Sequence, residues 1–485
     1  MGTHPNDQAP RPNSLRLAAP VTARIRVRAP LVLLTGALRS AATQRPNILV
    51  IAVDDLNTDL GCYGHPTVQT PNTDRLARRG VRFDRAYCQY PVCNPSRTSL
   101  LSGLYPEATH VLDNRTPPRS HLKDVVFLPE FFRRNGYFTA RIGKVFHDGM
   151  DGPEDWDLRL DPRPSSGIGS TGEGRNLTGG KFAFFRWMAA EGGDEDQPDG
   201  LIAREAVRLI LQKHDKPFFI AVGFRKPHDP YVAPKKYFEP YPLEKIPAPE
   251  GPADDESDIP RLALPTVRHN LGVQEGREFR RAYYACISFM DAQLGKVLEA
   301  LENSAARHNT LIVFFGDNGL HLGEHGWWNK VTLFERSARV PLIIALPESR
   351  PPGAVCHQPV ELVSLYATLA ELAGLAAPAH LQGPSLVPLL RNPARPWALP
   401  AYTVVTRGNA MGRSIRTARY RYTEWDGGRQ GVELYDHDMD PHEYRNLAAD
   451  PAYAGVIREL KRLLEERARL AGSLDPNPMP SGVRR

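Results

Sequence analysis

The sequence predicts an α/β fold in which a large, mixed but mostly parallel sheet lies between helices. Two continuous apolar runs, residues 47–53 and 310–315, are rich in β-branched and aromatic residues, as is typical of strands buried on both faces. Such runs alternate along the chain with stretches of helical periodicity, which indicates a parallel sheet covered by helices. The expected helices span 128–135, 201–213, 278–303 and 363–372.

Residues 1–44 are expected to form a leader with a signal segment. Arg24, Arg26 and Arg28 precede a short apolar run at 29–38, and small residues follow at 40–42. This order is that of a secretory signal, so we expect export to the periplasm or the cell exterior. The alternative is a disordered tail on a cytoplasmic protein. The apolar run is too short for a transmembrane helix.

Acidic and amide side chains follow both buried strands directly. Asp54 and Asp55 come after the first run, and Asp317 and Asn318 come after the second. Ligands of open α/β sheets bind at the carboxyl ends of strands, so these four residues are expected to meet. Their oxygens suit Ca²⁺, which we expect in preference to Mg²⁺, and do not suit zinc. The alternative for each acid alone is a turn or a helix cap.

The run C-N-P-S-R at 93–97 is the most specific motif of the chain. Alone, it fits a buried cysteine before an ordinary helix, since a free Cys packs as a small hydrophobe. The motif and the Ser102-Gly103 pair after it resemble the signature of the type I sulfatases. The resemblance runs from about residue 45 to 440 and implies an alkaline phosphatase-like fold. It also implies that a formylglycine-generating or equivalent maturation enzyme oxidises Cys93 to formylglycine, whose hydrate attacks the sulfur of a sulfate ester.

Four stretches look most like the iduronate-2-sulfatase branch of that family: 61–64, 143–147, 226–228 and 322–326, the last leading to Lys330. The resemblance implies that Cys93 is the nucleophile and, as the hydrate, a metal ligand. It implies that Arg97 holds the hydrate, while Lys144 and Lys330 bind sulfate oxygens. One position departs from the branch, which carries Asp-His where this chain has Asp317-Asn318.

Two histidines complete the implied machinery. His147 would act on the second hydroxyl of the nucleophile, and His228 would face the leaving oxygen. Histidine suits both roles because its ordinary pKa lies near the working pH. Taken alone, Lys144 and His147 fit the solvated face of a helix, and His228 fits an ordinary Pro-rich loop.

These residues lead us to expect a sulfate ester hydrolase that acts on a sulfated carbohydrate. The resemblance favours 2-O-sulfate on a uronic acid at the end of a glycosaminoglycan-type oligosaccharide. Another carbohydrate sulfate, such as an algal fragment, is the second choice, because Asn318 departs from the branch. Two rival functions stay open: a phosphate or phosphonate ester hydrolase of the alkaline phosphatase superfamily, and a sugar-binding protein whose cysteine is never converted.

Composition agrees with a large enzyme. The chain has 485 residues, of which 41% are hydrophobic, and a net charge of +6 that suits a polyanionic substrate. It carries no basic-aromatic motif for nucleic acid, no zinc spacing and no repeat. The five cysteines suggest no dense disulfide framework.

We expect three regions: the leader at 1–44, a catalytic domain at 45–395, and a C-terminal part at 396–485. Residues 226–265 are rich in Pro and acids and predict a long surface excursion beside the site. Trp327 and Trp328 could floor a sugar pocket or belong to the core. After residue 396 the pattern changes to short alternating strands and a final helix, with a tail beyond 473. This part resembles the smaller C-terminal antiparallel sheet and helix of the sulfatases. These elements are expected at 402–406, 413–417, 420–425, 433–436 and 456–470.

Overall fold

The fold is taken from a computed structural model that describes residues 45–165, 167–249, 251–252, 256–347 and 353–472. The described residues between 45 and 472 belong to one compact unit, and the division expected at 395 stays a prediction. The expected leader and the tail beyond 473 lie outside the described residues. Among the described helices, none combines the length and the apolar character that a membrane span requires.

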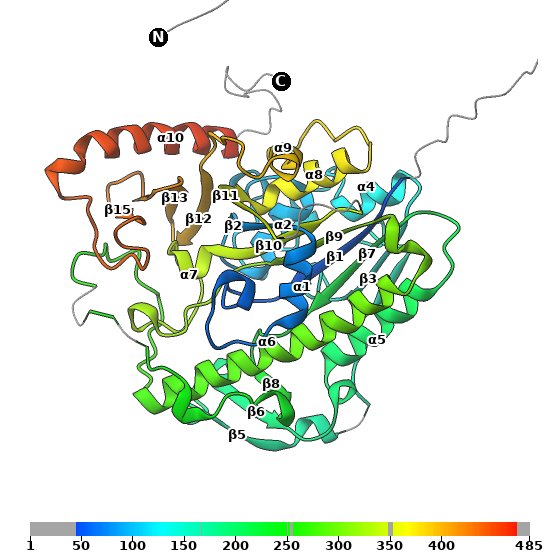
Figure 1. The fold of residues 1–485 in the computed structure, drawn as a ribbon. Coiled ribbons are helices and arrows are strands. Elements are labelled where there is room, and N and C mark those ends of the chain that lie inside the picture. Colours follow the sequence, from blue (N-terminus) through cyan, green and yellow to red (C-terminus); the bar gives the residue numbers. More distant parts are fainter. Residues whose placement is uncertain (1–44, 166, 250, 253–255, 348–352, 473–485) are drawn as a thin grey trace, which may run out of the picture. The chain divides into compact units, whose positions relative to one another are not determined.

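The main sheet has eight strands in the order β11-β2-β10-β9-β1-β7-β3-β4 (Figure 1). All neighbouring strands pair in parallel except β10, which runs antiparallel to both β2 and β9. The expected α/β class with a mixed, mostly parallel sheet is therefore confirmed. The strands are β1 (Asn47–Val53), β2 (Val81–Tyr87), β3 (Phe138–Gly143), β4 (Leu158–Leu160), β7 (Phe218–Phe224), β9 (Thr310–Gly316), β10 (Arg339–Ala345) and β11 (Ala354–Glu361).

The centre of the sheet explains why residues 48–53 and 311–315 include no polar side chain. Strand β1 lies between β7 and β9, and β7 and β9 are buried along their whole lengths. Alternate residues of β1 enter different cores: Leu49 and Ile51 pack in one, while Ile48 and Val50 pack in the other. The register pairs Val53 with Phe224 on one side and with Gly316 on the other. The three strands thus end level, so the residues that follow them share one edge.

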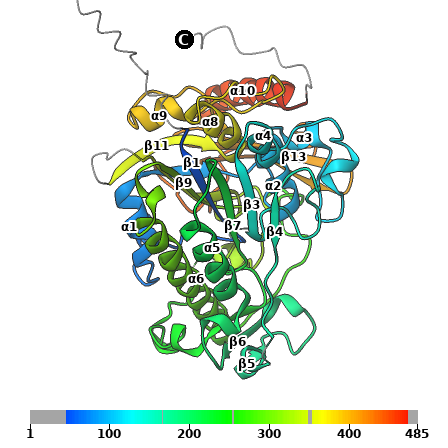
Figure 2. The same cartoon turned by 90° about the vertical axis from the view of Figure 1, so that its right-hand side faces the viewer.

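Helices cover both faces, as Figures 1 and 2 show. The face of Leu49 and Ile51 packs against α1 (Pro71–Arg79), α5 (Pro198–Leu211) and α6 (Val273–Glu302). The face of Ile48 and Val50 packs against α2 (Cys93–Ser102), α4 (Leu128–Arg134), α8 (Leu365–Leu372) and α9 (Val387–Arg391). The four expected helices are confirmed, with shifted ends. Pro198 occupies the first turn of α5, where its missing N–H costs nothing, and this helix starts earlier than expected.

A second, smaller sheet was not predicted. It joins β5 (Gly172–Asn176), β6 (Arg186–Ala190) and β8 (Tyr231–Pro234), and β8 packs beside α6. Strand β8 lies inside the expected surface excursion 226–265 and is buried. The Pro-rich composition around it hid a four-residue strand that gains its partner, β6, from a distant segment.

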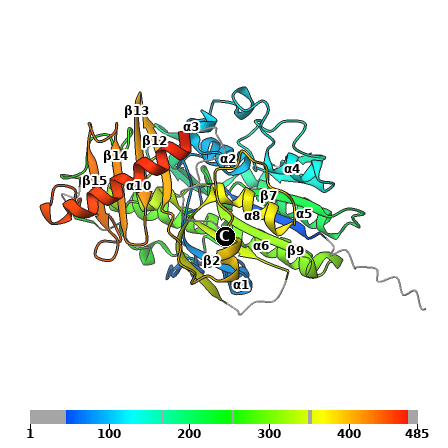
Figure 3. The same cartoon turned by 90° about the horizontal axis from the view of Figure 1, so that it is seen from above.

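The C-terminal sheet is antiparallel and its strands pair in chain order, as expected. It consists of β12 (Ala401–Arg407), β13 (Ala410–Arg416), β14 (Tyr420–Trp425) and β15 (Val432–Asp436), and α10 (Ala454–Gly472) lies across it (Figure 3). Two short helices, α3 (Pro106–Thr109) and α7 (Glu335–Ala338), complete the set. Trp327 packs in the core of this sheet and Trp328 in the core beside α6, so both tryptophans are buried core residues.

Candidate active site

The level strand ends bring three carboxylates and an amide together. Asp54 and Asp55 follow β1, Asp317 and Asn318 follow β9, and all four are buried. Carboxylate oxygens of the three acids lie within 4.8 Å of one another. Oδ1 of Asp317 accepts the backbone N–H groups of Asp55 and Asn318, each at 2.9 Å, and so fixes one loop against the other. Asp55 adopts a left-handed backbone with φ 57°, which is uncommon outside glycine and is found at functional turns.

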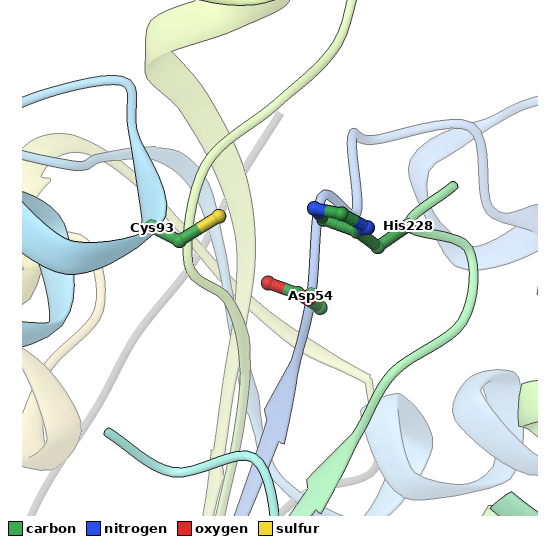
Figure 4. Close-up of side chains that lie close together, drawn as sticks. All are labelled: Asp54, Cys93 and His228. Atoms are coloured by element: carbon green, nitrogen blue, oxygen red, sulfur yellow. The ribbon is translucent and has the colours of Figure 1, made fainter. Parts of the chain in front are cut away.

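Cys93 reaches this cluster from the first residue of α2. The backbone of Val92 before it is extended, so the helix begins at the cysteine itself. The side chains of Cys93, Asp54 and His228 converge (Figure 4), with possible ligand atoms within 4.8 Å of one another. The Sγ atom of Cys93 lies 3.7 Å from Oδ1 of Asp55. Burial raises the pKa of Cys93 well above its usual value, although Lys330 opposes the shift, so the thiol is neutral.

Arg97, one turn further along α2, ties three strand ends together. Its Nε donates to Asp317 at 2.7 Å and its Nη2 to Asp54 at 3.0 Å. Its Nη1 donates to the backbone carbonyls of Lys144 and Val145, which follow β3. Burial opposes the charge, but Asp317 and Asp54 outweigh it and raise the pKa of Arg97, which stays cationic.

Two lysines approach the carboxylates from different loops. Nζ of Lys144 lies 2.5 Å from Oδ2 of Asp54, and Nζ of Lys330 bonds to Oδ1 of Asp55 and lies 2.9 Å from Sγ of Cys93. Burial would lower the pKa of each lysine, but the carboxylates raise it instead. The pKa of Asp54 is lowered in turn: burial opposes this shift, and Lys144 is the strongest charge favouring it. Both lysines are therefore charged at neutral pH.

Two buried oxygens of the cluster have no hydrogen-bond partner in the described part of the chain: Oδ2 of Asp55 and Oδ1 of Asn318. Leaving such atoms unsatisfied is costly, so buried polar groups without partners call for an explanation. Nε2 of His228 lies 3.8 Å from Oδ2 of Asp55, beyond hydrogen-bond distance. A hard divalent cation held by carboxylate and amide oxygens would satisfy both atoms, and the donor set fits Ca²⁺ or Mg²⁺.

The two expected histidines lie on the cavity side of the cluster. Nδ1 of His228 lies 3.1 Å from a carboxylate oxygen of Asp229, and its side chain is 28% exposed. His147 follows β3, and burial, with help from Lys144, lowers its pKa to about 4, so it is neutral at pH 7. No hydrogen bond joins His147 to Cys93 among the residues that the structure describes.

The loop that carries His228 is held by two residues with no catalytic contact. Asp199 on the first turn of α5 accepts the backbone N–H groups of Arg225 and Lys226, both at 2.9 Å. Nζ of Lys226 donates to the backbone carbonyls of His228 and Pro230. Lys226 therefore points into its own loop. Nothing in the sequence pattern singled out Asp199, because its role depends on a loop 26 residues away.

A cavity of about 530 Å³ opens beside the cluster. Its lining includes Asp54, Lys144, His147 and His228, all of which the sequence indicated. The lining also includes Arg186, Met188 and Val232, which the sequence did not indicate. These three lie on strands β6 and β8 of the small sheet, and the failure to predict these strands explains the omission.

Comparison with known proteins identifies the family of the chain. The model of the sulfatase family matches residues 46–375, and the model of the C-terminal region of N-sulphoglucosamine sulphohydrolase matches 323–469. A sulfatase of Formosa agariphila is 36% identical over 87% of this chain and 86% of its own length. Iduronate 2-sulfatase of Mus musculus is 32% identical over 88% of this chain and 95% of its own length. A solved protein in complex with its substrate D-glucosamine-2-N,6-O-disulfate has a TM-score of 0.73 and 25% identity, over 89% of this chain and 99% of the other.

Proposed function

Because the chain belongs to the sulfatase family and is a sulfuric ester hydrolase, we propose that it desulfates a carbohydrate, namely a 2-O-sulfated uronic acid. The proposed nucleophile is formylglycine made from Cys93, and the proposed metal is Ca²⁺ held by Asp54, Asp55, Asp317 and Asn318. One observation carries this proposal: Cys93 is buried beside two lysines and three carboxylates, in a cluster that leaves two oxygens without partners.

The state of Cys93 supports its conversion. A thiol attacks as the thiolate, and burial keeps this thiol neutral. Oxidation by a maturation enzyme would replace the sulfur with an aldehyde oxygen, and the hydrated aldehyde supplies two hydroxyl groups at that place. We also propose that the protein is exported to the periplasm or the cell exterior, as the signal-like pattern of residues 1–44 suggests.

The remaining side chains have roles that follow from their charge and position. Lys144 and Lys330 neutralise sulfate oxygens, which an anionic ester requires before an oxygen nucleophile can approach. A bound divalent cation supplies further charge stabilisation. His228 gives a proton to the leaving oxygen. His147, neutral at pH 7, accepts the proton of the nucleophile's second hydroxyl.

The substrate proposal is supported by similarity and by space. The chain resembles iduronate 2-sulfatase over most of its length, and the solved neighbour holds a sulfated sugar. The cavity of about 530 Å³ lies in the range of roughly 300–1,000 Å³ that holds a whole small ligand. A sugar sulfate needs protonation of its leaving oxygen, whereas an aryl sulfate does not. His228→Ala should therefore slow sugar sulfates more than aryl sulfates, and equal losses would contradict the role of His228.

Replacement of the nucleophile tests the activity itself. Cys93→Ala should lower kcat/KM on aryl and sugar sulfates by about 10³-fold or more while thermal unfolding stays cooperative. Intact mass of the active protein should show that Cys93 has lost sulfur and gained oxygen. Cys62→Ala, at a half-buried thiol outside the cluster, is the control and should keep full activity.

Three results would contradict the proposal. The nucleophile is wrong if Cys93→Ala retains substantial turnover or if the active protein carries an unmodified thiol. Faster cleavage of phosphate or phosphonate esters than of sulfate esters would favour the rival hydrolase. Desulfation of non-uronate sugars alone would overturn the substrate while leaving the sulfatase activity.

A further inference from the structure

We propose that Arg186 binds a second anionic group of the substrate, a carboxylate or another sulfate, at a place separate from the sulfate that is cleaved. The proposal rests on the proposed function and adds the residue that selects for the rest of the substrate. It assigns this selectivity to the small sheet, because Arg186 is the first residue of β6.

The small sheet presents one face to the cavity and the other to the core. Successive residues of a strand point to opposite faces. Trp187 and Ala189 pack in the core beside α6, and their neighbour Met188 lines the cavity with Val232 of β8. Met188 and Val232 are direct partners in the pairing of β6 with β8. Arg186 lies two residues before Met188 and so belongs to the cavity face, where it is exposed.

Other cations of the cavity wall are already engaged. Arg225 forms two hydrogen bonds to the carboxylate of Asp148, at 2.8 and 3.0 Å. Lys226 donates to backbone carbonyls, and Lys144, beside Asp54, is assigned to the cleaved sulfate. The side chain of Arg186, by contrast, forms no ion pair or hydrogen bond with any residue that the structure describes. Its guanidinium is thus available to a ligand.

The chemistry of that ligand follows from the group and its place. A guanidinium offers parallel N–H donors that match a carboxylate or a sulfate bidentately. In the proposed function, Lys144, Lys330 and the cluster at the main sheet bind the cleaved sulfate. Met188 and Val232 beside Arg186 can pack against the apolar face of a sugar ring. A substrate with one sulfate at the cluster and one further anion at Arg186 would fill both parts of the cavity.

The test compares substrates with and without a second anion. Arg186→Gln should lower kcat/KM for a 2-O-sulfated uronate oligosaccharide by roughly 10- to 100-fold, the loss expected for hydrogen bonds to a charged group. The carboxyl-reduced oligosaccharide and an aryl sulfate should change little. Arg186→Lys should recover part of the loss. Arg204→Gln removes an exposed arginine of α5 that pairs with Glu195, and as the matched control it should change none of these values.

Two further arms identify the anion and separate this proposal from the proposed function. The effect of Arg186→Gln on kcat/KM for a disulfated neutral sugar and for its monosulfated form tests whether a second sulfate can bind Arg186 in place of a carboxylate. Binding of the carboxylate-bearing and carboxyl-reduced oligosaccharides is measured by calorimetry on Cys93→Ala, with and without Arg186→Gln, so the result does not depend on turnover. A larger Kd for the anionic form alone supports the proposal. Equal effects of Arg186→Gln on both forms, or none, would overturn it even if the wild type is an active sulfatase.

Discussion

The carboxylates at the edge of the main sheet are buried, and of those beside the C-terminal sheet Glu443 is buried and Glu335 half-buried, yet the two groups differ in how their atoms are paired. At the main sheet, Asp55 and Asn318 each keep a buried oxygen without a partner. Beside the C-terminal sheet, Glu335, His437 and Glu443 also bring possible ligand atoms within 4.8 Å of one another. None of these three residues contributes a buried atom without a partner in the described part of the chain.

The second group, here the Arg421 network, contains its own cation. Arg421 of β14 donates to Glu335 and to Glu443, and a ring nitrogen of His437 lies 3.0 Å from Glu443. Tyr87 donates to the other oxygen of Glu335 at 2.9 Å. Burial would raise the pKa of Glu443, but Arg421 and His437 lower it to about 2. The guanidinium of Arg421 thus supplies the positive charge that a metal ion would supply in a metal site.

The contrast shows that residue type and spacing do not by themselves identify a metal site. Each group brings three possible ligands together, but among the described residues Asp55 and Asn318 keep buried oxygens without partners, whereas Glu335, His437 and Glu443 do not. Buried polar atoms without partners are expensive, so unpaired oxygens favour a cation site and paired ones indicate a structural role.

The largest expected difference between the two groups concerns metal and activity. Asp54→Ala should remove the bound divalent ion, lower kcat/KM by about 10²-fold or more and reduce thermal stability. Loss of a residue that only orients a metal ligand typically lowers metal affinity or activity by roughly 10- to 100-fold, so loss of a ligand itself should have at least that effect. Metal analysis of the purified protein and assays after chelation measure this. Glu443→Gln is the control and should keep the metal. An active protein without a divalent ion, insensitive to chelation, would remove the distinction between the groups.

A smaller effect, on stability alone, is expected in the Arg421 network. Arg421→Met leaves two buried carboxylates without their main partner and should lower the free energy of unfolding by about 3–5 kcal/mol. Denaturant melts give this value, while metal content and kcat/KM of the folded protein should not change. Loss of the metal in Arg421→Met before any loss of stability would show that the network also serves the active site.

The smallest expected effect, on the pH dependence of stability, concerns the carboxyl group of Glu433, which keeps its proton to a higher pH than that of Glu443. Burial raises the pKa of Glu433 to about 7, although Trp425 and Tyr435 donate hydrogen bonds to it. The folded state therefore holds a proton that the unfolded state releases near pH 4.5, so stability should fall as pH rises from about 4.5 through about 7. The fall should be about 2 kcal/mol between pH 5 and pH 7. Glu433→Gln should flatten this part of the stability profile, and an unchanged slope would show that Glu433 is ionised.

Local sequence was enough to predict the elements that form the active site. Strands β1 and β9 were identifiable because strands buried on both faces are almost entirely apolar, and the acids after them differ clearly from that background. The motif at 93–97 was identifiable because its residues are adjacent in the chain. The meeting of Asp54 with Asp317 followed from a general property of parallel sheets, and the structure brings them together as expected.

Contacts between distant segments were decided by the tertiary structure alone. The partner of β8 is β6, the partner of Asp199 is the loop before His228, and the cation beside Glu443 is Arg421. Trp327 and Trp328 had two possible environments, and packing placed both in the core. The sequence determined the two central strands, the four helices and the C-terminal strands, and it indicated the residues of the candidate site, because periodicity and adjacency are local. Which charges are paired and which stay available, as with Arg186, depends on chain packing that no local pattern records.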